Sequence, residues 1–479
     1  MEPHAGHLHF QNLNKMEITL KSISENLPKE GPSYLKKINN WLKNYPKTIV
    51  VLDDDPTGCQ TVHDIPVLTT WSIEALQSEF ESNISLFFIL TNTRSLPEDE
   101  AVTLTRNIAD NLKKAASNAG KEFNVISRSD STLRGHYPAE INTLKNTLEL
   151  QDAVEIIVPA FFDGGRYTAN GLHYVEDKGK LIPAALTPFA KDMSFGYNNS
   201  SLDKWIEEKT QGNITASEVI ILTIEKIRTH SPEALSSFFS SIKKSSICTI
   251  DALVASDLEK VALAIHMAEK DGYQFIFRTA ATFVQVYGGI TEIPLLSKSE
   301  LSFNNNPGLI IVGSYVPKTS FQLNYLINNN PSLSKIEIDA QKLISTEAEI
   351  EIQRCIAAIQ SGFKKGNTIL LYTSRKLLTA NNSKNQLTNG QKISAGLIAV
   401  VKNLDVNPGY ILAKGGITSN DIATKALGIK RAIVKGQLLP GVPVWETSFE
   451  SKYPGIPYIV FPGNVGNEES LFEACMKLK

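Results

Sequence analysis

The sequence predicts an α/β protein with two domains, each built on a mainly parallel sheet flanked by helices. The chain has 479 residues, which is too many for a single hydrophobic core. Short β-branched runs alternate with longer amphipathic stretches, a pattern typical of βαβ units. This alternation stops at a polar segment, residues 297–308, and then restarts. We therefore expect an N-terminal extension at residues 1–46, one domain at 47–299 and a second at 307–479.

The first domain is expected to alternate strands with helices. Its strand-like runs are short, apolar and rich in β-branched residues, and they lie at residues 48–54, 84–91, 123–128, 154–160, 218–223 and 275–280. Amphipathic stretches at residues 98–119 and 258–271 predict two of the helices between them. The extension before Thr48 is expected to be weakly helical.

The second domain is expected to repeat the same alternation. Its apolar runs begin at residue 309 and continue at residues 368–374, 410–416, 431–436 and 456–466. A helix is predicted around residues 394–403. The second domain is therefore also predicted to be α/β.

Composition excludes several classes of function. The net charge is −2 and the sequence pI is about 6.5, so the chain has no basic field for nucleic acid or an anionic membrane. The four cysteines lie far apart without a CxxC pair, which argues against a zinc site or a disulfide framework. No apolar run approaches the ~20 residues of a membrane helix, and the N-terminus lacks the apolar core of a secretory signal. We expect a soluble cytoplasmic protein.

An acidic turn follows the first predicted strand. Asp53, Asp54 and Asp55 stand directly before Pro56, Thr57 and Gly58. Adjacent carboxylates repel one another unless a cation or a proton-bearing ligand lies among them, and ligands bind at the carboxyl ends of strands in open α/β sheets. The alternative is a solvated acidic turn.

Three further strand ends carry ligand-capable side chains. Two arginines, hydroxyl groups and an aspartate follow the strand at 123–128, and they could bind a carboxylate or phosphate while Asp130 acts as a general base. A surface salt-bridge cluster is the alternative. The candidates at the three ends are Asn92, Arg94, Arg128, Asp130, Ser131, Thr132, Arg134, Gly165 and Arg166. If these ends meet at one sheet edge, they form a pocket suited to a small polyhydroxy acid.

Three glycine turns follow strands of the second domain and offer main-chain donors for a polyphosphate. Their candidate residues are Ser314 after Gly313, then Gly415, Gly416, Ile417 and Thr418, and finally Gly463, Asn464 and Gly466. Thr418, Ser419 and Asp421 are predicted to form a capping box for the helix that follows. Lys414 and Lys435 either neutralise phosphate or are ordinary surface lysines. Neither a Walker sequence nor a GxGxxG motif after a strand occurs.

Six sequence motifs, in order, resemble the four-carbon acid sugar kinase family: DDDPTG, SRSDSTLRG, GSYVPKTSFQ, KGGITSNDIATKALGI, KGQLLPGVPVW and FPGNVGNEESL. The resemblance runs from about Thr48 to the C-terminus. It implies an N-terminal acid-sugar-binding domain, a C-terminal nucleotide-binding domain and phosphorylation of compounds such as threonate, erythronate and 3-oxo-tetronates by ATP. It also implies ATP contacts at Ser314, 415–418 and Gly463, and a sugar-acid site at Asp54, Arg94, Asp130, Ser131 and Arg134.

The first turn departs from the D-D-x-T-G-A form of many members of this family. The extra aspartate, the proline and Cys59-Gln60 resemble the branch that includes 3-oxo-isoapionate kinases. We expect Cys59 to pack beneath the turn rather than to act as a nucleophile.

These observations lead to one principal hypothesis and two alternatives. The principal hypothesis is a kinase in which Asp54 or Asp130 accepts the hydroxyl proton, Arg134 and Arg94 hold the substrate carboxylate, and Mg²⁺ is held mainly by the ATP phosphates. No dedicated metal cage is expected from the protein, and the sequence leaves the oligomeric state open, with a homodimer as one option. The alternatives are a non-catalytic sugar-acid sensor and a metal-dependent aldolase or dehydratase that uses residues 53–55.

Overall fold

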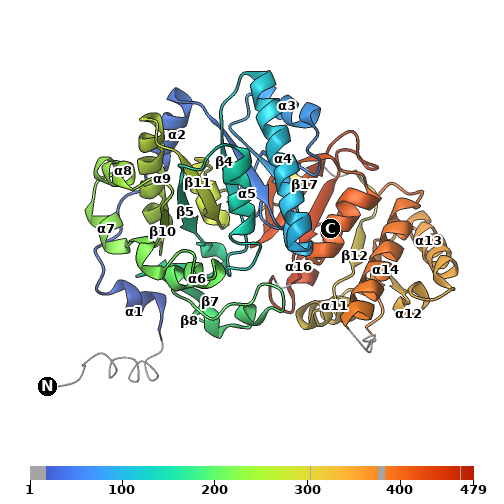
Figure 1. The fold of residues 1–479 in the computed structure, drawn as a ribbon. Coiled ribbons are helices and arrows are strands. Elements are labelled where there is room, and N and C mark those ends of the chain that lie inside the picture. Colours follow the sequence, from blue (N-terminus) through green and yellow to red (C-terminus); the bar gives the residue numbers. More distant parts are fainter. Residues whose placement is uncertain (1–17, 302–303, 376–382, 464) are drawn as a thin grey trace. The chain divides into compact units, whose positions relative to one another are not determined.

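The computed structural model describes residues 18–301, 304–375, 383–463 and 465–479 (Figure 1). The chain forms two compact units. Of the described residues, the first unit contains 18–41, 130–138 and 150–287, and the second contains those within 42–129, 139–149 and 288–479. The second unit therefore combines the first predicted strands with the whole C-terminal part of the chain.

One half of the second unit is a parallel sheet with strand order β2-β3-β1-β4. Its elements are β1 (Thr48–Asp53), β2 (Ile65–Leu68), α3 (Ile73–Glu81), β3 (Leu86–Leu90), the 3₁₀ turn η2 (Thr93–Ser95), α4 (Glu98–Ala119), β4 (Phe123–Arg128) and α5 (Ala139–Thr147). All residues of β1 and β3 are buried, as expected for strands covered on both faces. Helix α4 packs between α3 and α5 (Figure 1).

The other half of the second unit has parallel strand order β13-β14-β12-β15-β18. Two antiparallel strands, β17 and β16, continue the sheet from β18 to β2. The strands are β12 (Leu309–Val312), β13 (Ser334–Ile338), β14 (Ile369–Thr373), β15 (Ile411–Lys414), β16 (Arg431–Leu439), β17 (Val442–Thr447) and β18 (Pro457–Phe461).

Helices of the second unit pack in pairs, with α11 against α16 and α13 against α14 (Figure 1). They are α11 (Pro317–Asn329), α12 (Ala340–Leu343), α13 (Ala348–Lys364), α14 (Ser383–Lys402), α15 (Gly416–Asp421) and α16 (Ser470–Lys477). A π-helical turn, η8 (Ile422–Ala426), continues α15. The segment before β12 contains the 3₁₀ turn η7 (Lys298–Glu300), and its Leu296 and Leu301 join the hydrophobic core of this unit.

The first unit contains a parallel sheet with strand order β11-β5-β10-β9 and a separate antiparallel sheet, β6-β7-β8. The strands are β5 (Val154–Val158), β6 (Arg166–Ala169), β7 (Leu172–Asp177), β8 (Lys180–Pro183), β9 (Ile220–Leu222), β10 (Ile247–Ile250) and β11 (Phe275–Thr279). The α-helices are α6 (Leu202–Lys209), α7 (Ile224–Thr229), α8 (Pro232–Ser241), α9 (Ala255–Lys270) and α10 (Ala281–Tyr287). The 3₁₀ turns are η3 (Phe162–Gly164), η4 (Ala184–Leu186), η5 (Pro188–Lys191) and η6 (Ala216–Glu218).

The N-terminal extension forms two helices, α1 (Leu20–Ser24) and α2 (Leu35–Asn44). Between them, the main-chain N–H of Tyr34 donates to the Glu259 carboxylate at 2.5 Å. Arg228 donates to the carbonyl of Pro28 at 2.9 Å. Hydrogen bonds therefore attach the described part of the extension to the first unit.

The predicted fold class is confirmed: the protein is α/β, with a largely parallel sheet flanked by helices. The sequence did not predict the antiparallel pair β16 and β17 or the small sheet β6-β7-β8. A run of β-branched residues indicates a strand but carries no information about its direction, which depends on distant pairing partners. Within the described ranges, no helix combines the length and apolar character needed to cross a lipid bilayer.

Candidate functional site

The acidic turn lies where three parallel strands of the second unit end. Asp53 is the last residue of β1, and it is paired in register with Leu90 of β3 and Arg128 of β4. The side chains that follow these strands are therefore neighbours, as the sequence predicts for strand ends of a parallel sheet.

Arginines from the two neighbouring strand ends neutralise the acidic turn. Arg128 Nη1 lies 3.2 Å from Asp53 Oδ1 and 3.8 Å from Asp54 Oδ1. Arg94 Nη1 lies 3.8 Å from Asp54 Oδ1, and Arg94 Nη2 forms an ion pair with Asp55. The cationic groups required among the three carboxylates thus come from the protein itself. The solvated-turn alternative is wrong, because Asp53 and Asp54 are only 2% and 3% exposed.

The aspartates of this turn titrate differently because their surroundings differ. Burial raises the pKa of Asp53 to about 7, although the charge of Arg128 opposes this shift. Burial would also raise the pKa of Asp55, but Arg94 and the Thr57 hydroxyl outweigh it and hold that pKa below its usual range. Of Asp53 and Asp55, Asp53 therefore has the higher pKa.

Short-range contacts fix the shape of the acidic turn. The main-chain N–H of Thr57 donates to Asp55 Oδ1 at 2.9 Å. A Cβ atom built on Gly58 would lie 2.0 Å from Asp53 Oδ2, so only glycine fits there. Asn92 has φ 52° and donates its N–H to the carbonyl of Asp53 at 3.3 Å. All the candidates of this turn are thus brought together.

Asp54 lines a small internal cavity of about 10 Å³. Its other polar neighbours there include Thr91, Ser127, Arg128 and Glu140. A cavity of this size with several polar partners has room for about one water molecule. Asp54 therefore lies in a buried polar environment within the second unit.

Three glycine turns meet around Ser314 in the same unit. Strands β12, β15 and β18 are adjacent and in register, with Val312, Lys414 and Phe461 aligned at their ends. A Cβ on Gly415 would lie 2.8 Å from Ser314 Cβ, and one on Gly463 would lie 3.4 Å from Ser314 Oγ. This close approach of main chain leaves N–H groups without side chains in front of them.

Gly415 supports this arrangement with a backbone conformation that favours glycine, φ 116° and ψ 138°. The helix after it, α15, begins at Gly416 and has no side-chain cap. The predicted capping box at Thr418, Ser419 and Asp421 is therefore wrong. The turn at Gly415 starts the helix earlier than expected and places these residues inside it, where the Ser419 hydroxyl donates to the carbonyl of Ala413 at 2.7 Å.

Lys414 is hydrogen-bonded to the main chain beside the glycine turns. It is completely buried, and its Nζ donates to the carbonyl of Pro462 at 2.6 Å. Burial, with help from the charge of Lys318, lowers the pKa of Lys414 to about 7. The surface-lysine alternative is wrong for Lys414. Lys435 instead lies 3.6 Å from Asp64 in an ion pair.

The remaining candidates of the glycine turns have distinct surroundings. Ile417 is 64% exposed, whereas Thr418 is buried, and a Cβ on Gly313 would meet Thr418 Oγ1 at 2.4 Å. Gly466 has φ 81°, which again favours glycine. Asn464 lies outside the described residues.

The acidic turn and the glycine turns meet within the second unit. A Cβ built on Gly416 would lie 3.7 Å from Asp55 Oδ2. A carboxylate that is already paired with an arginine therefore lies beside the glycine turn that opens α15.

A second group of candidates lies in the first unit. Arg134 binds Asp130 with two hydrogen bonds, Nε to Oδ2 at 2.9 Å and Nη2 to Oδ1 at 3.2 Å. The main-chain N–H of Thr132 also donates to Asp130 Oδ2, at 3.1 Å. Arg134 Nη1 lies 3.5 Å from Asp192 Oδ2. Asp130 is thus oriented by several donors, as expected for a carboxylate with a fixed role.

Arg166 joins this group through an aromatic ring. The guanidinium groups of Arg134 and Arg166 lie 5.2 and 5.6 Å from the centre of the Phe189 ring. Burial lowers the pKa of Arg166, and the charge of Arg134 lowers it further, against the effect of Asp130. Gly165 precedes Arg166 with φ 72°, and its Cβ would lie 2.8 Å from Glu176 Cβ.

Several contact residues of these groups were not predicted. The carbonyl of Ser131 interacts with His173 Nε2 at 2.8 Å, and the Tyr197 hydroxyl donates to the carbonyl of Thr132 at 2.8 Å. In the second unit, Arg375 donates to the carbonyl of Ser314. Because Arg375 follows directly after a predicted strand, the strand-end argument could have found it.

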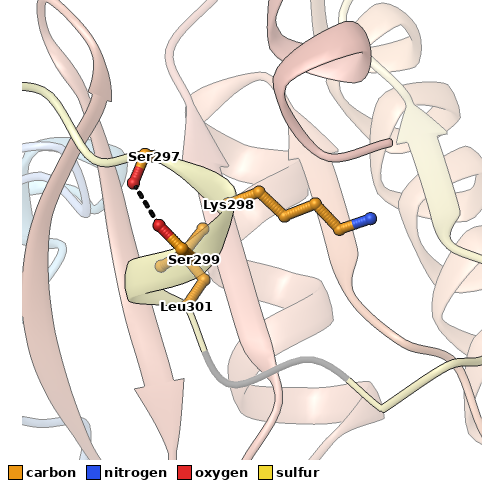
Figure 2. Close-up of a pocket in the computed structure, with 4 residues that line it drawn as sticks. All are labelled: Ser297, Lys298, Ser299 and Leu301. Atoms are coloured by element: carbon orange, nitrogen blue, oxygen red, sulfur yellow. Dashed lines mark hydrogen bonds between the residues drawn. The ribbon is translucent and has the colours of Figure 1, made fainter.

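A surface hollow of the second unit lies apart from these turns. It measures about 610 Å³ and is lined by Ser297, Lys298, Ser299 and Leu301. Figure 2 shows the hydroxyls of Ser297 and Ser299 hydrogen-bonded to each other while Lys298 extends away from them. None of the predicted site residues lines this hollow, so we do not include it in the candidate functional site.

Comparison with known families accounts for both halves of the sequence. Residues 49–287 match a family described as a sugar-binding N-terminal domain. Residues 309–471 match a family described as a nucleotide-binding C-terminal domain. The chain belongs to the four-carbon acid sugar kinase family. No curated protein matches the sequence.

Solved structures share the fold of this family member. A protein of Salmonella typhimurium LT2, provisionally named a tRNA synthase, is 16% identical with a TM-score of 0.63, and the match covers 90% of this chain and 99% of that one. A Haemophilus influenzae protein of family DUF1537 is also 16% identical, with a TM-score of 0.60 and coverage of 90% and 100%. At this level of identity, both matches concern the fold alone.

Proposed function

We propose that the protein is an ATP-dependent kinase that phosphorylates a hydroxyl group of a small sugar acid. The observation that carries this proposal is the position of Asp55, 3.7 Å from the Cβ position of Gly416 in the glycine turn. Phosphoryl transfer requires main-chain donors for the nucleotide phosphates next to polar groups that hold the acceptor. The matches to a sugar-binding and a nucleotide-binding family support the same conclusion.

The glycine turns fit the nucleotide phosphates. Ser314, Gly415 and Gly463 approach one another closely, and side chains at the glycine positions would fill the space between them. We assign the ATP contacts to Ser314, residues 415–418, Gly463 and Gly466. Main-chain N–H groups in such turns stabilise the negative charge that moves during transfer.

We propose two alternative acceptor sites, each within one unit. In the first unit, Arg134 holds the carboxylate of the sugar acid and Asp130 accepts the proton of the attacked hydroxyl, whereas in the second unit Asp54 of the acidic turn accepts that proton. Arg94 is already paired with Asp54 and Asp55, so its proposed contribution is to hold the acidic turn in position as well as to bind substrate. Mg²⁺ would supply charge neutralisation on the ATP phosphates, and Asp55 is the carboxylate nearest to the proposed phosphate turn.

The acceptors proposed are four-carbon or branched sugar acids, such as threonate, erythronate, a 3-oxo-tetronate or 3-oxo-isoapionate. The test is ADP release from ATP and Mg²⁺ with a panel of these compounds. Turnover on at least one member is expected. A protein that binds ATP but turns over no member of the panel would contradict the kinase proposal.

Two variants separate the proposed proton acceptors. Asp130→Asn should lower turnover by about 10²- to 10⁴-fold while ATP affinity stays within about twofold, because a general base acts on the acceptor and not on the nucleotide. Asp54→Asn is measured beside it. If Asp130→Asn keeps full turnover and Asp54→Asn does not, the base is Asp54.

The two alternatives make different predictions. A sensor would be stabilised by sugar acids without ADP release, and the glycine turns around Ser314 would then lack a nucleotide. An aldolase or dehydratase would lose activity with a chelator and be indifferent to ATP. The pairing of Asp53, Asp54 and Asp55 with two arginines favours the kinase over a metal site built from these three residues.

A further inference from the structure

Arg375 lies beside the glycine turns at the end of a neighbouring strand. It follows β14, which pairs in register with β12 so that Tyr372 is opposite Val312. Its Nη1 donates to the carbonyl of Ser314, and its guanidinium carbon lies 5.7 Å from the centre of the Tyr315 ring. These two contacts hold one edge of the guanidinium group beside Ser314, the residue on which the three turns meet.

Within the described residues, the opposite edge of the same guanidinium is buried and makes no hydrogen bond. Nε and Nη2 of Arg375 are buried, and neither has a hydrogen-bond partner in the part of the chain that the structure describes. These two nitrogens form the side-on fork that binds two oxygen atoms of one phosphate or carboxylate group. A buried charged donor without a partner costs free energy, so the fork is suited to an anion that arrives with a ligand.

Arg375 differs in this respect from Arg94, Arg128 and Lys435. Arg94 and Arg128 are paired with aspartates, and Lys435 is paired with Asp64. Arg375 has no carboxylate within 4 Å among the described residues. Burial lowers its pKa, against the weaker opposing effects of Tyr315, Glu337 and Tyr372. No carboxylate of the described ranges therefore forms an ion pair with Arg375.

We infer that Arg375 is a further nucleotide-binding residue, whose Nε and Nη2 hold oxygens of the terminal phosphates of ATP. This inference rests on the proposed function and adds a residue that discriminates between nucleotides by the number of their phosphates. The contact from Nη1 to the Ser314 carbonyl would hold the guanidinium beside the turns, and the fork on its opposite edge would add charged donors to the main-chain donors there.

The test measures the affinities of the purified full chain for ATP, ADP and AMP by calorimetry. The wild type should prefer ATP over AMP. Arg375→Gln should weaken ATP binding by about 10- to 100-fold and leave AMP binding within about twofold, because a hydrogen bond to a charged group contributes about 1.5–3 kcal/mol. Arg375→Lys keeps the charge but lacks the fork, so it should recover only part of the ATP preference.

The matched control is Arg354→Gln. Arg354 lies in the same unit, and its charge is already paired with Glu351. This variant should keep the wild-type ratio of ATP to AMP affinity.

The outcomes are distinguishable. If Arg375→Gln, folded as judged by circular dichroism, weakens ATP and AMP equally or affects neither, the inference is overturned while the proposed kinase stands. If Arg375→Lys restores the full ATP preference, the fork is not the recognition element. A wild-type protein that binds no ATP would instead overturn the proposed function on which this inference depends.

Discussion

The acidic turn and the glycine turns occupy the ends of strands in the same unit, yet they are built in opposite ways. In the acidic turn, charged side chains crowd together and are neutralised by Arg94 and Arg128. In the glycine turns, side chains are absent at the points of closest approach, and the main chain itself is presented. The acidic turn thus depends on ion pairs and the glycine turns depend on the absence of side chains, so each should respond to a different kind of substitution.

The largest effect is expected at Gly58, where a buried ion pair and the absence of a side chain are both required. Gly58→Ala would place a Cβ about 2 Å from the Asp53 carboxylate and force apart its buried pair with Arg128. We expect the free energy of unfolding to fall by about 3–5 kcal/mol, measured by urea denaturation. The control Gly390→Ala adds a methyl group in open space and should not destabilise the protein. If both variants are equally stable, the ion pair does not constrain this turn.

The next largest effect is expected at Gly415. Alanine there must adopt φ 116° and would meet Ser314 Cβ at 2.8 Å. We expect a loss of about 1–3 kcal/mol in stability, together with at least a roughly tenfold loss of ATP affinity.

Gly455→Ala provides the matched control for Gly415. Gly455 has φ 70° but nothing within 4 Å of its Cβ position. Its variant should lose about 1 kcal/mol of stability from the backbone alone and keep its ATP affinity. Equal ATP affinities in the two variants would argue against the phosphate role of the Gly415 turn.

The contribution of the acidic turn to protein stability should depend on pH, in contrast to that of the uncharged glycine turns. The pKa of Asp53 is raised from 3.8 to about 7, so between these values the folded state binds more protons than the unfolded state. This group therefore lowers stability as pH rises through that window, with a slope of at most about 1.4 kcal/mol per pH unit. The group contributes no slope below pH 3.8 or above about 7.

The variant Asp53→Asn removes this titration. The unfolding free energies of wild type and variant are measured by denaturation from pH 4 to 8. The stability of the wild type relative to the variant should fall as the pH rises. Asp152→Asn is the control, because Asp152 is exposed and pairs with Lys244 at the surface. A pH-independent difference for Asp53→Asn would show that Asp53 is charged throughout the range.

The smallest effect is expected at Cys59, which lies just beyond the acidic turn. Its Sγ is 3.1 Å from Trp445 Nε1, and burial raises the pKa of the thiol to about 12. Cys59→Ala should cost about 1 kcal/mol of stability and leave turnover unchanged. The thiol should resist alkylation at pH 8 in the folded protein and react after unfolding. Rapid alkylation in the folded state would contradict a packing role.

The order of the strand-ending motifs could be read from the sequence because it depends on local properties. Apolar runs such as those of β1 and β15, and the polar or glycine residues that follow them, are visible within a few positions. The helix at Glu98–Ala119 was predicted with its bounds for the same reason. The roles assigned to the site residues remain predictions until they are measured.

The partners of these residues could not be read in this way. Asp53 and Arg128 are 75 positions apart, and Arg94 and Asp55 are 39 positions apart. Which carboxylate meets which arginine is set by the order and register of β3, β1 and β4. The burial of Lys414 likewise depends on β18 packing beside β15.

Hydrophobic periodicity and glycine placement are local, so the amino-acid sequence alone predicted the α/β class, the positions of most strands and the types of residue that follow each strand. Three features became visible only in the folded chain: the acidic turn is neutralised by the protein's own arginines, Asp55 lies beside Gly416, and β16 and β17 run antiparallel. These features arise from pairing between distant strands, and the free energy of such pairing is a property of the folded chain as a whole.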